Sequence, residues 1–325
     1  MKITPIADKV FGAVVSEVKL GELSDAQFAE LNTAFLKYGF LVFPKQFLSD
    51  EDNVTFAEHF GELEFAASPM SNKPQNEDGS YADVSDIDTQ LMRTNVGNEA
   101  WHTDSTYKPL SSKCAMLSAV IVPEEGGETE LADLRSAYVA LDQKTKDRIS
   151  HLSAYHSAQF SQANDLGDFP PQDEDGIYHG EAYLRPMVKI HPETGVKNLF
   201  VARHAFGIRG LTREESRALL TSLRDFVVSD ESRVYTHKWQ AGDTLLWDNR
   251  ALLHRARPYD YSLPRVLTGT RVAGDPESEL AYYPTDPEAQ AGREALAAEL
   301  EILRVEAKDR RFGATTATKG RYSAR

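Results

Sequence analysis

Hydrophobic residues recur along the chain mainly in short stretches that favour strands. Residues 10–20 are rich in β-branched residues and predict a strand, and the apolar run 40–43 predicts a short buried strand. Between them, Ser24 is a candidate N-cap for a helix that ends at Gly39. Further strands are expected at about 114–122, 128–132, 152–156, 187–190, 198–201, 233–239, 243–248, 252–256 and 265–272.

A smaller number of segments carry helix start signals followed by apolar residues at helical spacing. Thr212, with Glu215 three residues further on, resembles a capping box. Further helices are expected at about 50–60, 134–142, 143–150 and 213–227. Many short strands with a few flanking helices predict a mainly β fold, a double-sheet β-barrel or jelly roll.

Two long segments lack periodicity and are interpreted as lid-like loops, at about 63–97 and 158–185. The composition changes at Pro276. We therefore expect one domain over 1–275 and a C-terminal extension over 276–325, with an amphipathic helix at about 286–310. That helix could form an oligomer contact or pack on its own barrel. A homo-oligomer, a dimer or a tetramer, is expected.

Composition narrows the class of protein. The chain has 325 residues, 41% of them hydrophobic, which is enough for a substantial core. Its net charge of −14 argues against nucleic-acid binding through phosphate neutralisation. The one cysteine, Cys114, excludes an intrachain disulfide and fits a reducing compartment. No apolar run approaches the roughly 18 residues of a membrane span, and the start of the sequence does not resemble a signal peptide. A cytoplasmic protein that does not bind membranes is expected.

The candidate chemistry begins at His102 and Asp104. In an extended segment, residues two apart share a face, so this imidazole and this carboxylate converge on one point. Two such ligands make a weak metal site, and a second histidine would complete the 2-His-1-carboxylate triad of non-haem Fe(II) oxygenases. Most single histidines are surface or core residues, but His254 lies at the end of a strand pair, with Arg265 in the next strand.

These residues, in this order, resemble the taurine dioxygenase / 2,4-dichlorophenoxyacetate dioxygenase family, whose pattern is His-x-Asp, then Thr or Ser, then a distal His, then an Arg. The resemblance covers roughly residues 5–275 and is nearest to the aryloxyalkanoate dioxygenases. His102, Asp104, Thr129, His254 and Arg265 match the pattern. The surrounding matches are Gly97-Asn98, Trp101-His102, Pro123-x-x-Gly126-Gly127-x-Thr129, His191-Pro192-Glu193-Thr194-Gly195 and Trp247-Asp248-Asn249-Arg250.

The resemblance implies a double-stranded β-helix fold and an oxygenase that uses Fe(II), 2-oxoglutarate and O₂. It implies that His102, Asp104 and His254 bind the iron, leaving three positions open. It also implies that Arg265 pairs with the far carboxylate of 2-oxoglutarate and that the Thr129 hydroxyl donates a hydrogen bond to it. The expected reaction is hydroxylation of a small, anionic organic substrate with release of succinate and CO₂. Breakage of a C–O, C–N or C–S bond can follow.

Substrate recognition is less determined. Several family members bind the substrate's acid group with an arginine four residues after the cosubstrate arginine, where this chain has Gly269. Arg271 shares a strand face with Arg265 and is the alternative cation, although it could instead pair with a local carboxylate. Asn98 and Ser105 are further candidates for substrate contact.

Two other functions stay open. One is a tailoring hydroxylase or desaturase in natural-product biosynthesis, and the other is a β-barrel protein that binds a ligand without catalysis. Iron-dependent formation of succinate would exclude the second.

Overall fold

The computed structural model describes residues 1–325 except 174–175, 283–287 and 314–325. In that part of the chain the largest sheet has seven strands in the order β1-β2-β3-β13-β5-β15-β4. All neighbouring pairs are antiparallel except β2 and β3. The strands are β1 Lys2–Pro5, β2 Ala13–Ser16, β3 Phe40–Phe43, β13 Thr244–Asp248, β5 Ser112–Ile121, β15 Val266–Ala273 and β4 Leu63–Ser71.

A smaller sheet faces the large one. It contains β12 (Val234–His237), β6 (Thr129–Asp133) and β14 (Leu252–Ala256), with β6 in the centre. Its Leu131 and Leu252 pack against Phe40 and Trp247 of the large sheet in one buried cluster. Two facing, mainly antiparallel sheets with a core between them form the expected jelly roll.

Helices close the outer face of the large sheet. The sequence of β3 is apolar throughout because both faces of the strand are buried. Phe40 and Val42 face the smaller sheet, and Leu41 and Phe43 face the helices. The covering helices are α1 Asp25–Tyr38 and α2 Asp50–Glu58, and each begins with a capping box, at Ser24 and Ser49 respectively.

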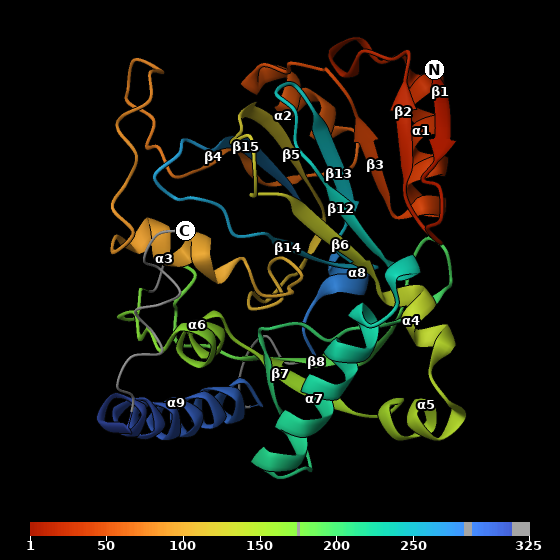
Figure 1. The fold of residues 1–325 in the computed structure, drawn as a ribbon. Helices are drawn as coiled ribbons and strands as arrows, with labels where there is room; N and C mark the ends of the chain where they lie inside the picture. Colours follow the sequence, from red (N-terminus) through yellow and green to blue (C-terminus); the bar gives the residue numbers. More distant parts are fainter. Residues whose placement is uncertain (174–175, 283–287, 314–325) are drawn as a thin grey trace.

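Most of the remaining helices lie at the other end of the molecule from α1 and α2, together with small strands (Figure 1). The predicted capping box at Thr212 is confirmed and begins α7, Arg213–Val228. The helices are α3 Gln90–Gly97, α4 Leu134–Ala140, α5 Gln143–Ile149, α6 Ala158–Leu166, α7, α8 Pro276–Glu279 and α9 Glu288–Gly313; short 3₁₀ turns lie at Leu20–Glu22 and Glu231–Arg233. The small strands are β7 Ser153–His156, β8 Tyr183–Pro186, β9 Val188–Ile190, β10 Lys197–Leu199 and β11 Ala205–Ile208.

Three local predictions were wrong. The segment 63–97 is not irregular throughout, because β4 pairs with β15 along its length and α3 follows before His102. The segment 158–185 contains the buried helix α6 and part of β8. The strand expected over 10–20 is shorter, Ala13–Ser16, and pairs with β1, which the pattern did not reveal.

The C-terminal segment contains the short helix α8 and the long helix α9; positions 286–287 of the expected helix and the tail after Gly313 lie outside the described residues. Leu296, Leu300 and Leu303 of α9 pack against Phe160 and Phe206. The apolar face of α9 thus packs against other parts of the same chain. This is the second of the two alternatives given for this helix, the first being an oligomer contact.

Candidate active site

His102 and His254 are held side by side by backbone pairing. His102 lies outside the regular strands but forms an isolated antiparallel bridge with His254 of β14. Each backbone N–H donates to the other residue's carbonyl, at 2.9 and 2.8 Å. Asp104 follows two residues later, and one ligand atom from each of the three side chains lies within 4.8 Å of the others.

The hydrogen bonds determine which atoms of these residues face a metal. His102 Nδ1 lies 2.7 Å from the Ala100 carbonyl oxygen, and a proton on Nδ1 leaves Nε2 as the free ligand atom. Asp104 Oδ2 is buried, accepts no hydrogen bond from the described residues and lies 3.5 Å from His254 Nε2. An unsatisfied carboxylate oxygen next to two imidazoles is the donor set that a divalent cation would complete.

The protonation states also suit a metal. Burial lowers the pKa of His102 well below its usual value, with a further contribution from His254, and burial also lowers the pKa of His254. Burial would raise the pKa of Asp104, but Arg271 and the two histidines outweigh this and lower it. At neutral pH the site therefore offers neutral imidazoles and a carboxylate, the forms that bind Fe(II).

A second part of the same pocket is built for an anion. Arg265, directly before β15, lines the pocket, and among the described residues its Nε and Nη2 donate only to the Gly127 carbonyl, at 3.1 and 3.0 Å. Burial lowers its pKa, and no carboxylate of the described residues forms an ion pair with it. A buried guanidinium without a counter-ion is costly unless an anion joins it.

Thr129 lines the pocket at the start of β6. Its hydroxyl oxygen accepts a hydrogen bond from Trp239 Nε1 at 3.0 Å, so its own proton remains available to an acceptor in the pocket. Trp239 is a residue whose role the sequence did not show.

The three residues predicted to contact substrate lie in different places. Asn98 lines the pocket at the end of α3. Arg271 also lines it, but its Nη2 donates to Asp104 Oδ1 at 2.6 Å. Ser105 is not among the described residues that line the pocket: it is fully buried, and its hydroxyl donates to Glu64. The expectation that Ser105 lines the pocket is therefore wrong.

Gly269 also lines the pocket, and the space beside it is filled. A Cβ atom at this position would lie 2.8 Å from Met70 Cγ and 3.4 Å from Leu117 Cδ2. Met70, on the neighbouring strand β4, fills the space beside Gly269. Phe65, Met70, Leu117 and Trp247 line the same pocket and form its apolar wall.

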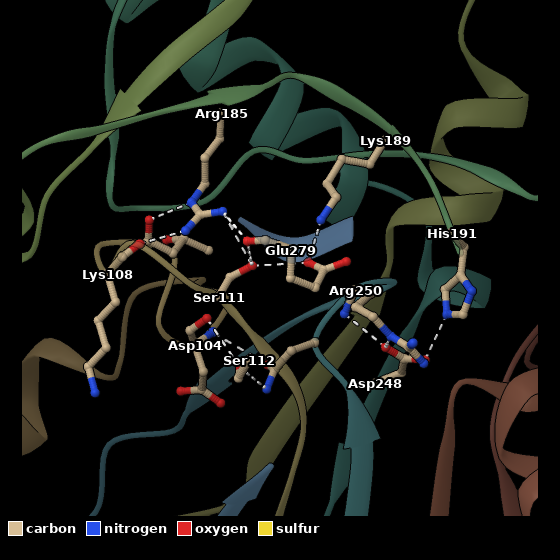
Figure 2. A network of polar contacts seen from close by, with 12 residues as sticks. Asp104, Lys108, Ser111, Ser112, Arg185, Lys189, His191, Asp248, Arg250 and Glu279 are labelled. Atoms are coloured by element: carbon tan, nitrogen blue, oxygen red, sulfur yellow. Dashed lines mark hydrogen bonds and ion pairs between the residues drawn. The ribbon is translucent and has the colours of Figure 1, made fainter. Parts of the chain in front are cut away.

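The loop after Asp104 is fixed by a buried polar network (Figure 2). Arg185 is fully buried and donates to the carbonyls of Thr106, Lys108 and Pro109. On the other side, Ser112 Oγ donates to the Asp104 carbonyl at 3.3 Å. The backbone that carries the carboxylate is thus held from both sides.

Comparison with known proteins agrees with this geometry. The family model described as "Taurine catabolism dioxygenase TauD, TfdA family" matches residues 2–271. The (S)-phenoxypropionate/alpha-ketoglutarate-dioxygenase of Sphingobium herbicidovorans is 46% identical over 284 residues, 86% of this chain and 97% of the relative. The alpha-ketoglutarate-dependent 2,4-dichlorophenoxyacetate dioxygenase of Cupriavidus pinatubonensis is 34% identical, over 79% of this chain and 93% of the relative.

A solved structure shares the fold. The crystal structure of AAD-2 in complex with Mn(II) and N-oxalylglycine has a TM-score of 0.79 at 33% sequence identity, and the match covers 87% of this chain and all of that one. The chain therefore belongs to the TauD, TfdA family and is an alpha-ketoglutarate (2-oxoglutarate)-dependent dioxygenase that uses Fe(II), 2-oxoglutarate and O₂.

Proposed function

We propose that this dioxygenase hydroxylates a small carboxylic acid that carries an aryloxy group. The single observation that carries the proposal is the pocket itself. It joins the His102, Asp104 and His254 cluster to an apolar wall and to a buried arginine that forms no ion pair with a carboxylate of the described residues. Loaded iron would couple oxidative decarboxylation of 2-oxoglutarate to hydroxylation of a substrate carbon, releasing succinate and CO₂. Where that carbon bears an ether oxygen, the product collapses to a phenol and a 2-oxoacid.

One group of residues would bind the iron and another would bind 2-oxoglutarate. We assign His102, Asp104 and His254 to the iron. Arg265 would bind the distal carboxylate of 2-oxoglutarate as a charge-assisted pair, and Thr129 would donate its hydroxyl proton to the same group. Trp239 orients Thr129 by occupying its oxygen.

The aromatic part of the substrate fits the apolar wall around Gly269. Asn98 supplies an amide to the same pocket. Arg271 was expected to bind the acid group of the substrate. Only its Nε–H could do so, because this group is buried and has no hydrogen-bond partner among the described residues. The relatives named above carry phenoxypropionate and 2,4-dichlorophenoxyacetate in their names, and both compounds are aryloxy acids.

Broader features agree with an enzyme of small molecules. Among the helices of the described residues, none combines the length and hydrophobicity needed to cross a membrane. The tailoring alternative gains no support from the named relatives. A cytoplasmic location and a homo-oligomer, dimer or tetramer, stay predictions.

The test is a comparison of substrates by stimulated 2-oxoglutarate decarboxylation. Both enantiomers of phenoxypropionate, 2,4-dichlorophenoxyacetate, taurine and an alkyl sulfate would each be added to the Fe(II) enzyme, and succinate and phenol measured. We expect an aryloxy acid to give the highest kcat/KM, with one phenol released per succinate. Stimulation by taurine or alkyl sulfate with no response to any aryloxy acid would refute the proposed substrate class. The Asp104→Ala protein serves as the blank.

A further inference from the structure

Asp104 has two carboxylate oxygens in different surroundings. Oδ1 accepts a 2.6 Å hydrogen bond from Arg271 Nη2. Oδ2 accepts no hydrogen bond from the described residues and lies 3.5 Å from His254 Nε2. If both oxygens were free, the carboxylate could rotate or bind a metal through both of them, and the second oxygen would take a position that cosubstrate needs.

Arg271 is itself held from several directions. Its Nη1 donates to Ser105 Oγ at 3.2 Å and lies 3.8 Å from Glu64 Oε1, and its guanidinium lies 4.8 Å from the Phe65 ring centre. Its side chain is 13% exposed. Burial alone would lower the pKa of Arg271, but Asp104 and its other partners outweigh this and raise it. The cation is fixed in place and remains charged.

Ser105 and Glu64 are the residues that hold Arg271 in place. Ser105 adopts a left-handed backbone conformation, with φ at +55°, which a non-glycine residue rarely does without a local reason. This turn directly after Asp104 brings the Ser105 hydroxyl to Glu64, at 2.8 Å from each oxygen. Glu64 in turn forms an ion pair with Lys108 at 2.6 Å.

Charge counting separates two roles for Arg271. The group contains two cations, Arg271 and Lys108, and two anions, Asp104 and Glu64. It is therefore balanced without any substrate acid, in contrast to Arg265, for which the described part of the chain supplies no ion-paired carboxylate. A residue whose main task was to capture an anionic substrate would not need two carboxylates beside it.

We propose that Arg271, supported by Ser105 and Glu64, is a positioning residue that occupies Asp104 Oδ1 and so presents Oδ2 alone to the metal. The inference rests on the proposed metal site and concerns its supporting residues. It needs no assumption about which substrate the enzyme takes. Partners of ligating carboxylates in other metalloproteins typically contribute 10- to 100-fold to affinity or activity.

The experiment is a titration of the metal-free, full-length protein with Mn(II), with free Mn(II) followed by electron paramagnetic resonance. We expect Arg271→Met to weaken Mn(II) binding about 10-fold. Deleting a cation next to a metal ligand would by itself strengthen binding, because the metal would no longer be repelled. A weakening therefore reports lost positioning, whereas unchanged or tighter binding would overturn the proposal.

Two further variants make the result specific. Lys108→Met removes the other cation of the group without touching Asp104 and should bind Mn(II) within about 2-fold of the wild type. An equal loss in Lys108→Met would overturn the proposal. Arg271→Lys retains a donor for Oδ1 and should recover most of the affinity, so it also decides the question if Arg271→Met does not fold; no recovery in a folded Arg271→Lys protein would count against positioning.

The result is independent of the proposed reaction. A protein that binds Mn(II) in this pattern but never decarboxylates 2-oxoglutarate would overturn the function and leave the role of Arg271 intact.

Discussion

Two arginines lie at opposite ends of the same strand, β15, and differ in their partners. Within the part of the chain that the structure describes, the side chain of Arg265, which precedes the strand, donates only to a backbone carbonyl. Arg271, near the end of the strand, contacts Asp104 and lies close to Glu64. Both side chains line the same pocket. The sequence placed both on one strand face and left open whether Arg271 binds substrate or pairs with a local carboxylate. The structure shows that the charge of one is free for an anion and the charge of the other is already balanced.

The difference teaches that a cation in a pocket identifies a ligand only after its neighbours are counted. Asp104 links the two cases, since it would bind the iron that holds one end of 2-oxoglutarate while Arg265 binds the other end. Four predictions test this comparison, beginning with the one of largest effect.

Removal of the shared carboxylate should have the largest consequence. In Asp104→Ala, iron loses a ligand and Arg271 loses its partner, so 2-oxoglutarate decarboxylation should fall at least about 1000-fold, or about 4 kcal/mol in activation free energy. The measurement is succinate formation with saturating Fe(II), with thermal unfolding as the check on folding. A variant that still couples decarboxylation to hydroxylation at the wild-type rate would exclude Asp104 as a metal ligand.

Removal of the free arginine should act on cosubstrate binding. Arg265→Met should weaken 2-oxoglutarate binding about 100-fold, because a charge-assisted bidentate contact contributes about 3 kcal/mol. Calorimetry on the Mn(II) form measures this directly. The affinity of Arg265→Lys for 2-oxoglutarate should lie between those of the wild type and Arg265→Met, since an ammonium cannot form the bidentate pair. If Arg265→Met bound 2-oxoglutarate normally, its lack of a carboxylate partner would need another explanation.

Gly269, between the two arginines, tests whether the apolar wall is closed. Gly269→Ala places a methyl group against Met70 and should lower the free energy of unfolding by about 1–3 kcal/mol, as overpacking does. Urea denaturation measures it. In the double variant with Met70→Ala the clash is removed, so the two effects should not add. Additive effects would show that Met70 is not what restricts this position.

The smallest effect is expected at the other cosubstrate contact. Thr129→Val should weaken 2-oxoglutarate binding about 2- to 10-fold, as befits one hydrogen bond from a neutral donor. Trp239→Phe removes only the N–H group that orients Thr129 and should weaken 2-oxoglutarate binding by a smaller factor. Both are measured by the same calorimetry, and a Trp239→Phe loss larger than that of Thr129→Val would contradict the proposed order of roles.

The segments predicted well are those whose local sequence already reflects their surroundings. Phe40–Phe43 is apolar because both faces of β3 are covered, and Ser24 and Thr212 carry the capping chemistry that their helices need. The family pattern likewise named His102, Asp104 and His254, which the structure brings together.

The failures have a physical cause that local sequence cannot show. The strand β4 contains Pro69 and is half-buried, which an edge strand tolerates because one side of its backbone needs no partner. Its conformation depends on β15, far along the chain. The helix α6 buries Gln159, Ser161 and Gln162, so its polar residues concealed a buried helix. The role of Glu64 beside Arg271 was not predicted, because Glu64 lies on β4 and its position depends on the pairing with β15. The alternation in Leu63-Glu64-Phe65 is nevertheless typical of a strand.

The backbone bridge between His102 and His254 has a consequence for metal loading. Because two peptide hydrogen bonds already join these segments, the two imidazoles do not have to find each other when iron arrives. Little chain entropy should then be lost on binding. The metal should load rapidly into a folded protein and raise its stability only by mass action, and chelation should release it without unfolding the chain.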